Sequence, residues 1–178
     1  MTEQPPKRNR VIEPPTIITD TREQDNLFSR GRRERGAEWT CDVTGARCVS
    51  DCLSEGDYSV RGVSACWCAV ERKSLQDFIG SLIQGQARFM AELERLKNYR
   101  YPLIIVEGNF QELRTGEYRS AAAPQSITGL MCRVLQDYRI PIHLSDSHVG
   151  AREFCLQFLM RANRMYHDAM HGAKHRYA

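Results

Sequence analysis

The sequence predicts an α/β fold in which a mixed central sheet is flanked by helices. Strand-like and helix-like apolar spacings alternate through the second half of the chain. Residues 101–108 form a short, almost wholly apolar run, as expected of a strand covered on both faces. In the first half, two apolar runs flank a break at Arg61 and Gly62, which is typical of an antiparallel hairpin. This order of elements predicts a sheet with helices on both sides.

The first half of the chain reads mainly as short strands. Residues 1–14 are polar, proline-bearing and basic, and we expect a disordered arm there, followed by a single domain over residues 15–178. A β-branched run over residues 15–20 predicts a first strand that ends at Asp20. We expect a helical turn or two over residues 26–36, strands over residues 39–43 and 47–53, and the hairpin over residues 58–73.

The second half changes its apolar period from two to about 3.6. Spacing from Phe78 to Leu96 predicts a helix that is interrupted near Gly85. Residues 127–138 and 151–170 also follow helical spacing, and residues 140–144 read as a further strand between them. Each strand of this half is therefore expected to lead into a helix.

Composition limits the class of protein. A chain of 178 residues that is 42% hydrophobic can form one compact domain with its own core. Its apolar runs fall short of the roughly 20 residues that span a membrane, and its start lacks the apolar core of a signal peptide. We expect an intracellular protein, in the cytoplasm or nucleoid of a bacterium or phage or in a eukaryotic nucleus. The seven cysteines are odd in number, so a disulfide framework is not expected.

The basic residues are mainly arginines. Net charge is only +3, but four of the 25 basic residues are lysines and the remaining 21 are arginines. Arginine binds phosphate with two parallel hydrogen bonds, so this bias favours a phosphate-rich partner, although genomic codon bias explains it equally well. One group of arginines is either a phosphate-contacting patch or a solvated loop, and consists of Arg30, Arg32, Arg33 and Arg35.

Three charged residues, Glu71, Arg72 and Lys73, end the second hairpin strand. Side chains two apart share a face, so Glu71 and Lys73 point one way and Arg72 the other. If the hairpin loop has three residues centred on Ser64, Asp57 lies opposite Glu71. Opposed carboxylates repel unless a cation joins them, and Mg²⁺ beside a lysine is the equipment of phosphodiester hydrolysis. The alternative is an exposed ladder of salt bridges.

These residues resemble the signature of the XPF-type (ERCC4-domain) structure-specific DNA endonucleases. Residues 56–58, "GDY", followed by Glu71-Arg72-Lys73 and, after three more residues, Asp77, are similar to that family's G-D-x(n)-E-R-K-x-x-x-D. "DTRE" at 20–23, "ARF" at 87–89 and "LIIVEG" at 103–108 extend the resemblance over about residues 16–145. The spaced pattern is far more specific than the generic PD-(D/E)xK pattern that contains it.

The resemblance implies a restriction-endonuclease-like PD-(D/E)xK nuclease core that cuts branched, forked or flapped DNA with Mg²⁺ or Mn²⁺, in DNA repair or recombination. By similarity, the metal ligands are Asp57, Glu71 and Asp20. Lys73 is implied to be catalytic, with Arg72 and Asp77 completing the site. The expected DNA-binding residues are Arg22 and Arg88, which lie in the shared motifs, together with Arg30, Arg32, Arg33 and Arg35.

Several of these residues have simpler explanations. Ser74 followed three residues later by Asp77 is the capping-box pattern of a helix start, and both roles are compatible. Arg72 could be an outer-face arginine paired with an acid such as Asp77. Cys48 and Cys52 have a spacing compatible with zinc, but core positions are favoured because no compact CxxC pair is present. The dispersed histidines, expected to be non-catalytic, are His143, His148, His167, His171 and His175.

The chain also departs from the family. Many members carry a tandem helix-hairpin-helix module after the nuclease, and no such paired pattern follows residue 142 here. DNA affinity would then depend on the nuclease domain, a second copy or a partner. We expect a homodimer through the C-terminal helices, whose large apolar residues include Phe154, Phe158, Met165 and Tyr166. The alternatives are another PD-(D/E)xK nuclease or resolvase, and a non-catalytic DNA-binding scaffold subunit.

Overall fold

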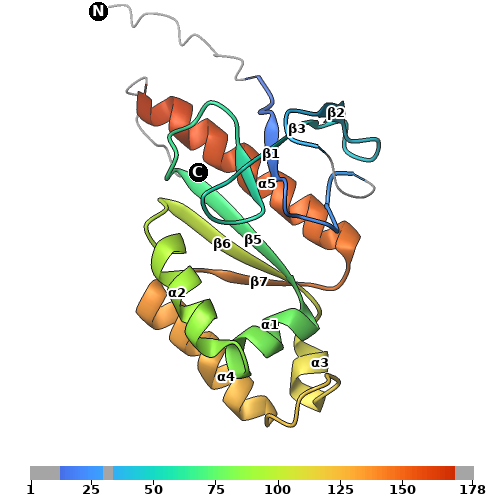
Figure 1. Ribbon diagram of the computed structural model, residues 1–178, viewed down its shortest axis with the longest axis vertical. Helices are drawn as coiled ribbons and strands as arrows, with labels where there is room; N and C mark the ends of the chain where they lie inside the picture. The colour runs from blue at the N-terminus through green and yellow to red at the C-terminus, as the bar shows by residue number, and fades with distance from the viewer. Residues whose placement is uncertain (1–12, 30–33, 171–178) are drawn as a thin grey trace, which may run out of the picture.

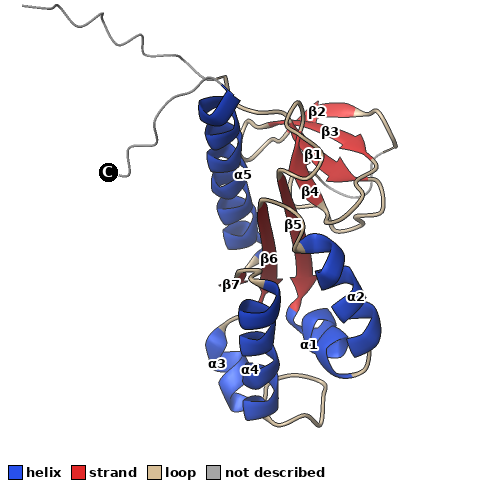
Figure 2. Ribbon diagram, turned by 90° about the vertical axis from the view of Figure 1, so that its left-hand side faces the viewer, coloured by secondary structure: helices blue, strands red, loops and turns tan. Residues whose placement is uncertain are grey.

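The computed structural model describes residues 13–29 and 34–170, and these form one seven-stranded mixed sheet with helices on both faces (Figures 1 and 2). The strands are β1 (Ile17–Asp20), β2 (Glu38–Thr40), β3 (Arg47–Asp51), β4 (Tyr58–Val60), β5 (Cys68–Ser74), β6 (Tyr101–Glu107) and β7 (Ile142–Ser145). The helices are α1 (Leu75–Ile83), α2 (Gln86–Leu96), α3 (Phe110–Thr115), α4 (Pro124–Arg133), the π-helical segment η1 (Val134–Tyr138) and α5 (His148–Met170). The predicted α/β class is confirmed.

The order of the strands gathers the charged residues at one end of the sheet. The order is β2-β3-β1-β4-β5-β6-β7. β5, β6 and β7 are mutually parallel, and β4 runs antiparallel to both β5 and β1. The carboxyl ends of β1, β5, β6 and β7 therefore lie at the same edge as the amino end of β4. Asp20, Asp57, the charged end of β5 and the start of α5 all lie along this edge.

Strand alternation gives the sheet two separate cores. Ile104 and Val106 of β6 point toward α1, α2 and α4, whereas Leu103 and Ile105 point toward α5. Figure 2 shows α5 on one side of the sheet and α1 and α2 on the other. The prediction that residues 101–108 form a strand covered on both faces is confirmed.

The helix expected from Phe78 to Leu96 is interrupted where the sequence predicts. α1 ends at Ile83 and α2 begins at Gln86, so Gly85 lies between them. The two helices pack through Phe78 and Phe89, whose rings meet edge to face with centroids 6.1 Å apart. This helix pair covers the face of the sheet that carries Glu71 and Lys73.

Other local predictions differ from the structure. The predicted helical turn over residues 26–36 is wrong for its described part, because the Asn26 side chain accepts a hydrogen bond from the Phe28 N–H (2.8 Å) and forms a turn. The hairpin connection spans residues 61–67 rather than three residues. α3 was not predicted. No helix of the described segments is long and apolar enough to cross a membrane.

Some predictions lie outside the described residues. These are the arm up to residue 12, the arginines Arg30, Arg32 and Arg33, and the histidines His171 and His175.

Candidate active site

The charged end of β5 divides its side chains between the two faces of the sheet. Ala69, two residues before Glu71, packs in the core under α1 and α2, whereas Val70, two residues before Arg72, packs in the core under α5. Because side chains alternate along a strand, Glu71 and Lys73 face α2 and Arg72 faces α5. The predicted separation of the three charges is therefore observed.

Asp57 lies at the start of β4, next to the end of β5. Tyr58 pairs with Val70. This is the register predicted for a loop centred on Ser64, in which the numbers of paired residues sum to 128. It sets Asp57 against Glu71. The Arg72 backbone N–H donates to Asp57 Oδ2 (2.7 Å). Gly56 precedes Asp57 with φ +78, and an added Cβ would lie 3.0 Å from the Val70 carbonyl oxygen. Only glycine fits this close turn, so the "GD" pair has a backbone reason as well as a chemical one.

Asp57 and Glu71 form a partly buried acidic pair. Burial raises the pKa of Asp57 to about 7, against the opposing hydrogen bond from Arg72, and the charge of Glu23 adds to the rise. Burial also raises the pKa of Glu71 to about 9, and the charge of Asp57 raises it further. The charge of Asp57 thus disfavours ionisation of Glu71, as expected of two acids that share a site. A cation between them would restore both charges.

Lys73 is the cation nearest to this acidic pair. Its Nζ donates to Glu71 Oε1 (2.7 Å), lies 3.3 Å from Glu92 Oε1 and sits 5.3 Å from the centre of the Phe89 ring. The enclosed Glu92 Oε1 has no hydrogen-bond partner among the described residues. Its contact with Lys73 is therefore an ion pair without hydrogen-bond geometry. Burial acts to lower the pKa of Lys73, but Glu71 and Glu92 outweigh it and raise that pKa. Lys73 is thus a protonated donor.

Sequence reasoning did not find Glu92. It lies on α2, one turn after Phe89, and its carboxylate is brought to Lys73 by the packing of α2 on the sheet. Its three-residue spacing from Phe89 was a possible signal, because positions three or four apart share a helix face. Glu92 can be identified as a partner of Lys73 only once the position of α2 on the sheet is known.

Arg72 lies on the opposite face, in a network of three carboxylates. Its Nε donates to Glu107 (2.7 Å), its Nη2 to Asp25 (2.5 Å), and its Nη1 lies 3.6 Å from Glu23. The arginine side chain is only 10% exposed. Burial acts to lower its pKa, but the hydrogen bond to Glu107 and the neighbouring acids raise it. The alternative pairing of Arg72 with Asp77 is not observed.

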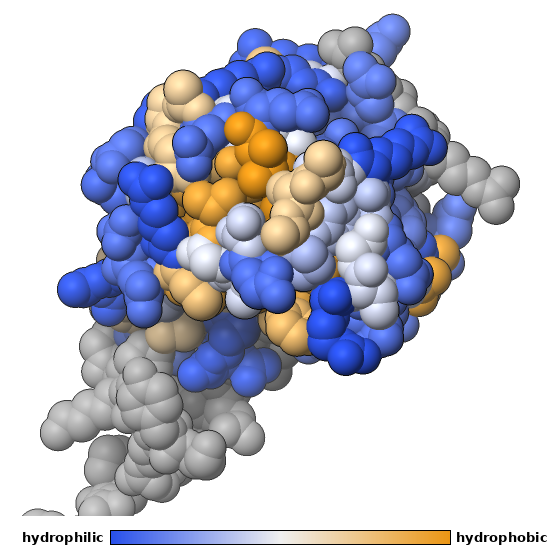
Figure 3. Space-filling model, turned by 90° about the horizontal axis from the view of Figure 1, so that it is seen from below, coloured by the Kyte–Doolittle hydropathy of each residue, from blue (hydrophilic) through white to orange (hydrophobic). Residues whose placement is uncertain are grey.

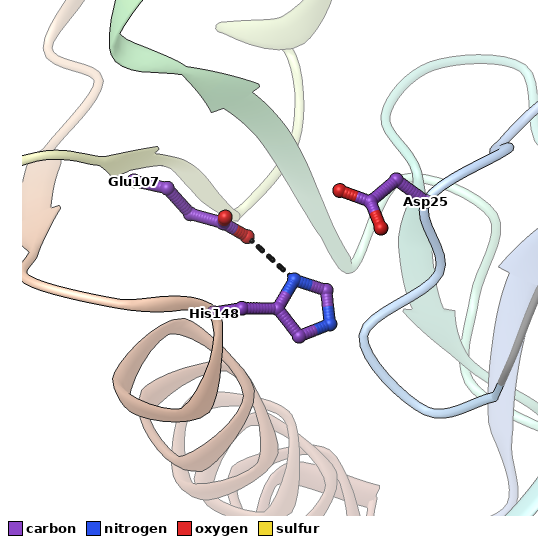
Figure 4. Close-up of side chains that lie close together, drawn as sticks. All are labelled: Asp25, Glu107 and His148. Carbon is purple, nitrogen blue, oxygen red and sulfur yellow. Dashed lines mark hydrogen bonds and ion pairs between the residues drawn. The ribbon is translucent and has the colours of Figure 1, made fainter.

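Asp25, Glu107 and His148 form a further cluster at this end of the sheet (Figure 4). Their ligand atoms lie within 4.8 Å of one another, and His148 Nδ1 lies 3.1 Å from Glu107 Oε1. Arg72 already binds both carboxylates, so a metal ion here would compete with its guanidinium. His148 was expected to be non-catalytic, and its nearness to Arg72 follows from the start of α5, which the sequence did not resolve.

Asp20 and Asp77 have well-defined local partners. Asp20 accepts hydrogen bonds from Arg22 and from the Leu53 N–H at both carboxylate oxygens. Burial acts to raise its pKa, but these hydrogen bonds lower it. The Asp20 N–H donates to the Asp57 carbonyl (2.8 Å), so the two acids lie on neighbouring strands. The Asp77 N–H donates to the Ser74 hydroxyl at the start of α1, which is the predicted cap.

The predicted DNA-binding arginines are spread over several elements. Arg22 pairs with Asp20, and Arg35 donates to Asp51 (2.9 Å). Arg88 is exposed on α2. Arg22 thus lies in the turn directly after Asp20 of β1, and Arg88 lies on the helix that also holds Glu92.

Comparisons with known proteins identify related folds. The family model described as "ERCC4 domain" matches residues 19–156. XPF from Aeropyrum pernix superimposes with a TM-score of 0.64 at 24% identity, covering 89% of this chain and 70% of that one. XPF from the same organism in complex with DNA gives a TM-score of 0.62 at 25% identity, covering 85% and 66%. These matches confirm the predicted restriction-endonuclease-like PD-(D/E)xK core.

One curated relative shares part of this region. A Methanocaldococcus jannaschii protein named as an ATP-dependent RNA helicase is 34% identical over 91 residues, which is 51% of this chain and 10% of that protein. The chain therefore spans about a tenth of the length of that relative.

Proposed function

The chain belongs to the ERCC4 domain family, and on this basis we propose that it is a divalent-metal-dependent DNA endonuclease that hydrolyses phosphodiester bonds in branched, forked or flapped DNA. The observation that carries the proposal is the partly buried pair of Asp57 and Glu71 with Lys73 beside it. A scaffold subunit has no physical need for opposed, partly buried carboxylates. This arrangement favours an enzyme over a DNA-binding scaffold.

The donor set fits a hard cation. Asp57 and Glu71 offer carboxylate oxygens, and Mg²⁺ binds through one or two carboxylates while keeping waters and phosphate oxygens in its shell. A bound Mg²⁺ or Mn²⁺ would supply charge stabilisation to the phosphate in the transition state. Asp20 is the proposed third ligand, on the strand next to Asp57, and it would have to release part of its pairing with Arg22 to bind the ion.

The protein's own residues would position the reactants. Lys73 is protonated, so we assign it to hold a water molecule or a phosphate oxygen by hydrogen bonding. Glu92 supports it from α2 through the second ion pair. The Arg72 backbone N–H orients Asp57 by hydrogen bonding to its carboxylate. The Arg72 guanidinium joins the end of β5 to three carboxylates, those of Glu23, Asp25 and Glu107. Asp77 supports the site by capping α1.

DNA is the proposed partner. The A. pernix XPF structure in complex with DNA supports this assignment. Arg22, in the turn after β1, and Arg88, on α2, are proposed phosphate contacts, as are Arg30, Arg32, Arg33 and Arg35 on the segment after β1.

A cleavage assay with a panel of DNA structures tests the function. Purified protein with Mg²⁺ should cut forked and flapped duplexes faster than a linear duplex of the same sequence, and EDTA should stop cleavage. Equal cutting of the linear duplex would favour a general PD-(D/E)xK nuclease, and preferred cutting of four-way junctions would favour a resolvase. Binding of all substrates without metal-dependent cutting would overturn the proposed activity.

We also propose that the protein acts as a homodimer through its C-terminal helices. Much of the aromatic stripe of α5 is used internally: Phe158 packs against the core, and Tyr166 meets Trp67 edge to face at 5.1 Å. Phe154 remains 39% exposed and stacks on His143. Figure 3 looks from below at the end of the molecule where α1, α3 and α4 lie in Figure 1, and it shows an apolar area bordered by polar residues there. These features leave apolar surface for a second copy.

Phe154→Glu should weaken the dimer without unfolding the domain, because this ring lies at the surface. Sedimentation at micromolar concentration should show a dimer for the wild type and a folded monomer for the variant. Phe158→Glu would remove a core contact and is a poor probe. A wild type that stays monomeric, with and without forked DNA, would rule the dimer out.

A further inference from the structure

A pocket of about 380 Å³ lies beside the candidate active site, on the α5 face of the sheet. Its walls are the segment after β1 (residues 25–29), the turn after β2 (residues 41–43) and the first turns of α5, from which His148 and Arg152 face it. Leu27, Phe28 and Cys41 are buried and give the pocket an apolar base. We name it the Arg152 pocket.

Arg152 is a buried arginine without a partner. Its side chain lies in a residue that is 9% exposed, its Nε is enclosed without a hydrogen bond, and no carboxylate of the described residues forms an ion pair with it. Arg72, whose side chain is 10% exposed, differs from Arg152 because three carboxylates lie around it. An unpaired buried charge destabilises a fold, so the guanidinium is expected to bind an anion in the pocket.

The surrounding groups favour the same class of ligand. The pocket lies beside the amino end of the 23-residue helix α5, whose dipole attracts anions, although the Gly150 N–H is already taken by the Ser147 hydroxyl. Of the two acids in the wall, Asp25 is paired with Arg72, which also contacts Glu23 and Glu107, and Asp42 is exposed to solvent. The volume exceeds that of a single phosphate and lies in the range of roughly 300–1,000 Å³ that accommodates small organic ligands.

We propose that the Arg152 pocket binds the phosphate group of a nucleotide, at a position distinct from the bond to be cut. The phosphate accepts hydrogen bonds from Arg152, and the attached sugar and base lie against the apolar base of the pocket. The ligand is either a free nucleotide or the phosphorylated end of a DNA strand. Only the second source depends on the proposed nuclease function, since phosphate binding itself follows from the pocket.

Calorimetric titration in EDTA tests the pocket without any contribution from catalysis. Deoxyadenosine 5′-monophosphate should bind the wild-type protein, and deoxyadenosine should not. Arg152→Met should weaken binding of the nucleotide roughly tenfold or more, because a charged hydrogen-bond donor is lost. Arg161→Met, which removes an exposed arginine of the same helix, is the matched control and should bind as the wild type does.

Two further readouts guard against a merely structural role of Arg152. In phosphate-free buffer, Arg152→Met should melt at a temperature equal to or above that of the wild type, because an unpaired charge is removed. Excess nucleotide should raise the melting temperature of the wild type alone. A forked duplex with a 5′-phosphate that binds more tightly than its 5′-hydroxyl counterpart identifies a strand end as the ligand, and equal binding identifies a free nucleotide.

The proposal is overturned if nucleotide and nucleoside bind the wild type equally, or if Arg152→Met and the wild type bind the nucleotide with the same affinity. Either result can occur in a protein that cuts DNA normally. Conversely, a protein without cleavage activity can still bind the nucleotide through Arg152, so the two proposals fail separately.

Discussion

Lys73→Ala should lower the rate of DNA cleavage by roughly three orders of magnitude, within the range that loss of one charged group aligned with the transition state produces. Lys73 is the cation hydrogen-bonded to Glu71, and its raised pKa keeps it protonated at neutral pH. Single-turnover cleavage of a labelled forked duplex at saturating Mg²⁺ measures the effect. Asp57→Asn and Glu71→Gln should reduce cleavage to a similar extent.

Lys97→Ala is the matched control for the lysine. Lys97 forms an ion pair with Glu94 and lies 5.8 Å from the centre of the Tyr138 ring, on α2 and away from Glu71. This variant should cut DNA as fast as the wild type, and both lysine variants should bind forked DNA in EDTA. Cleavage at the wild-type rate by purified, folded Lys73→Ala protein would contradict the proposed role of Lys73.

Glu71→Gln should make the metal-free protein more stable at alkaline pH while removing its activity. The folded-state pKa values of Asp57 and Glu71 are raised, to about 7 and about 9, above those of the unfolded chain. Their contribution to stability is therefore complete below about pH 4 and is lost as the pH rises through these two values. A glutamine at position 71 does not titrate, so the loss of stability with rising pH that Glu71 causes is absent from the variant.

Thermal melting between pH 5 and pH 9 in EDTA measures this effect. The melting temperature of Glu71→Gln relative to the wild type should rise with pH, and Mg²⁺ should raise the melting temperature of the wild type but not of the variant. Glu94→Gln, an exposed carboxylate on α2, should follow the wild type in both respects. Parallel pH curves for wild type and Glu71→Gln would refute the shared acidic site.

The sequence predicts the parts of the site that depend on strand geometry. Alternation along β5 separates Arg72 from Glu71 and Lys73, and it needs no knowledge of the tertiary fold. The register of Tyr58 with Val70 is also predicted, although the connection is longer than three residues. Residues added symmetrically to both sides of a hairpin loop leave the sum of paired residue numbers unchanged. The register was therefore correct although the loop length was wrong.

The missed residues depend on how helices are placed. Glu92 reaches Lys73 only because α2 packs on the sheet, and His148 reaches Glu107 only because α5 begins beside β6. The spacing of Glu92 from Phe89 indicates only a shared helix face and not the contact with Lys73, and the contact of His148 leaves no local pattern in the sequence. The pairing of Asp20 with Arg22 is local, but the same "DTRE" segment was assigned to metal and DNA binding by resemblance. Whether Asp20 also binds metal stays a prediction.

The location of a bound ion is the most direct test of the proposed metal site at Asp57 and Glu71. Anomalous diffraction from a crystal of the protein soaked in Mn²⁺ gives that location without reference to activity. We predict an anomalous peak between the carboxylates of Asp57 and Glu71, on the face of the sheet covered by α2. A peak only at Asp25, Glu107 and His148, or no peak near either carboxylate of the pair, would contradict it.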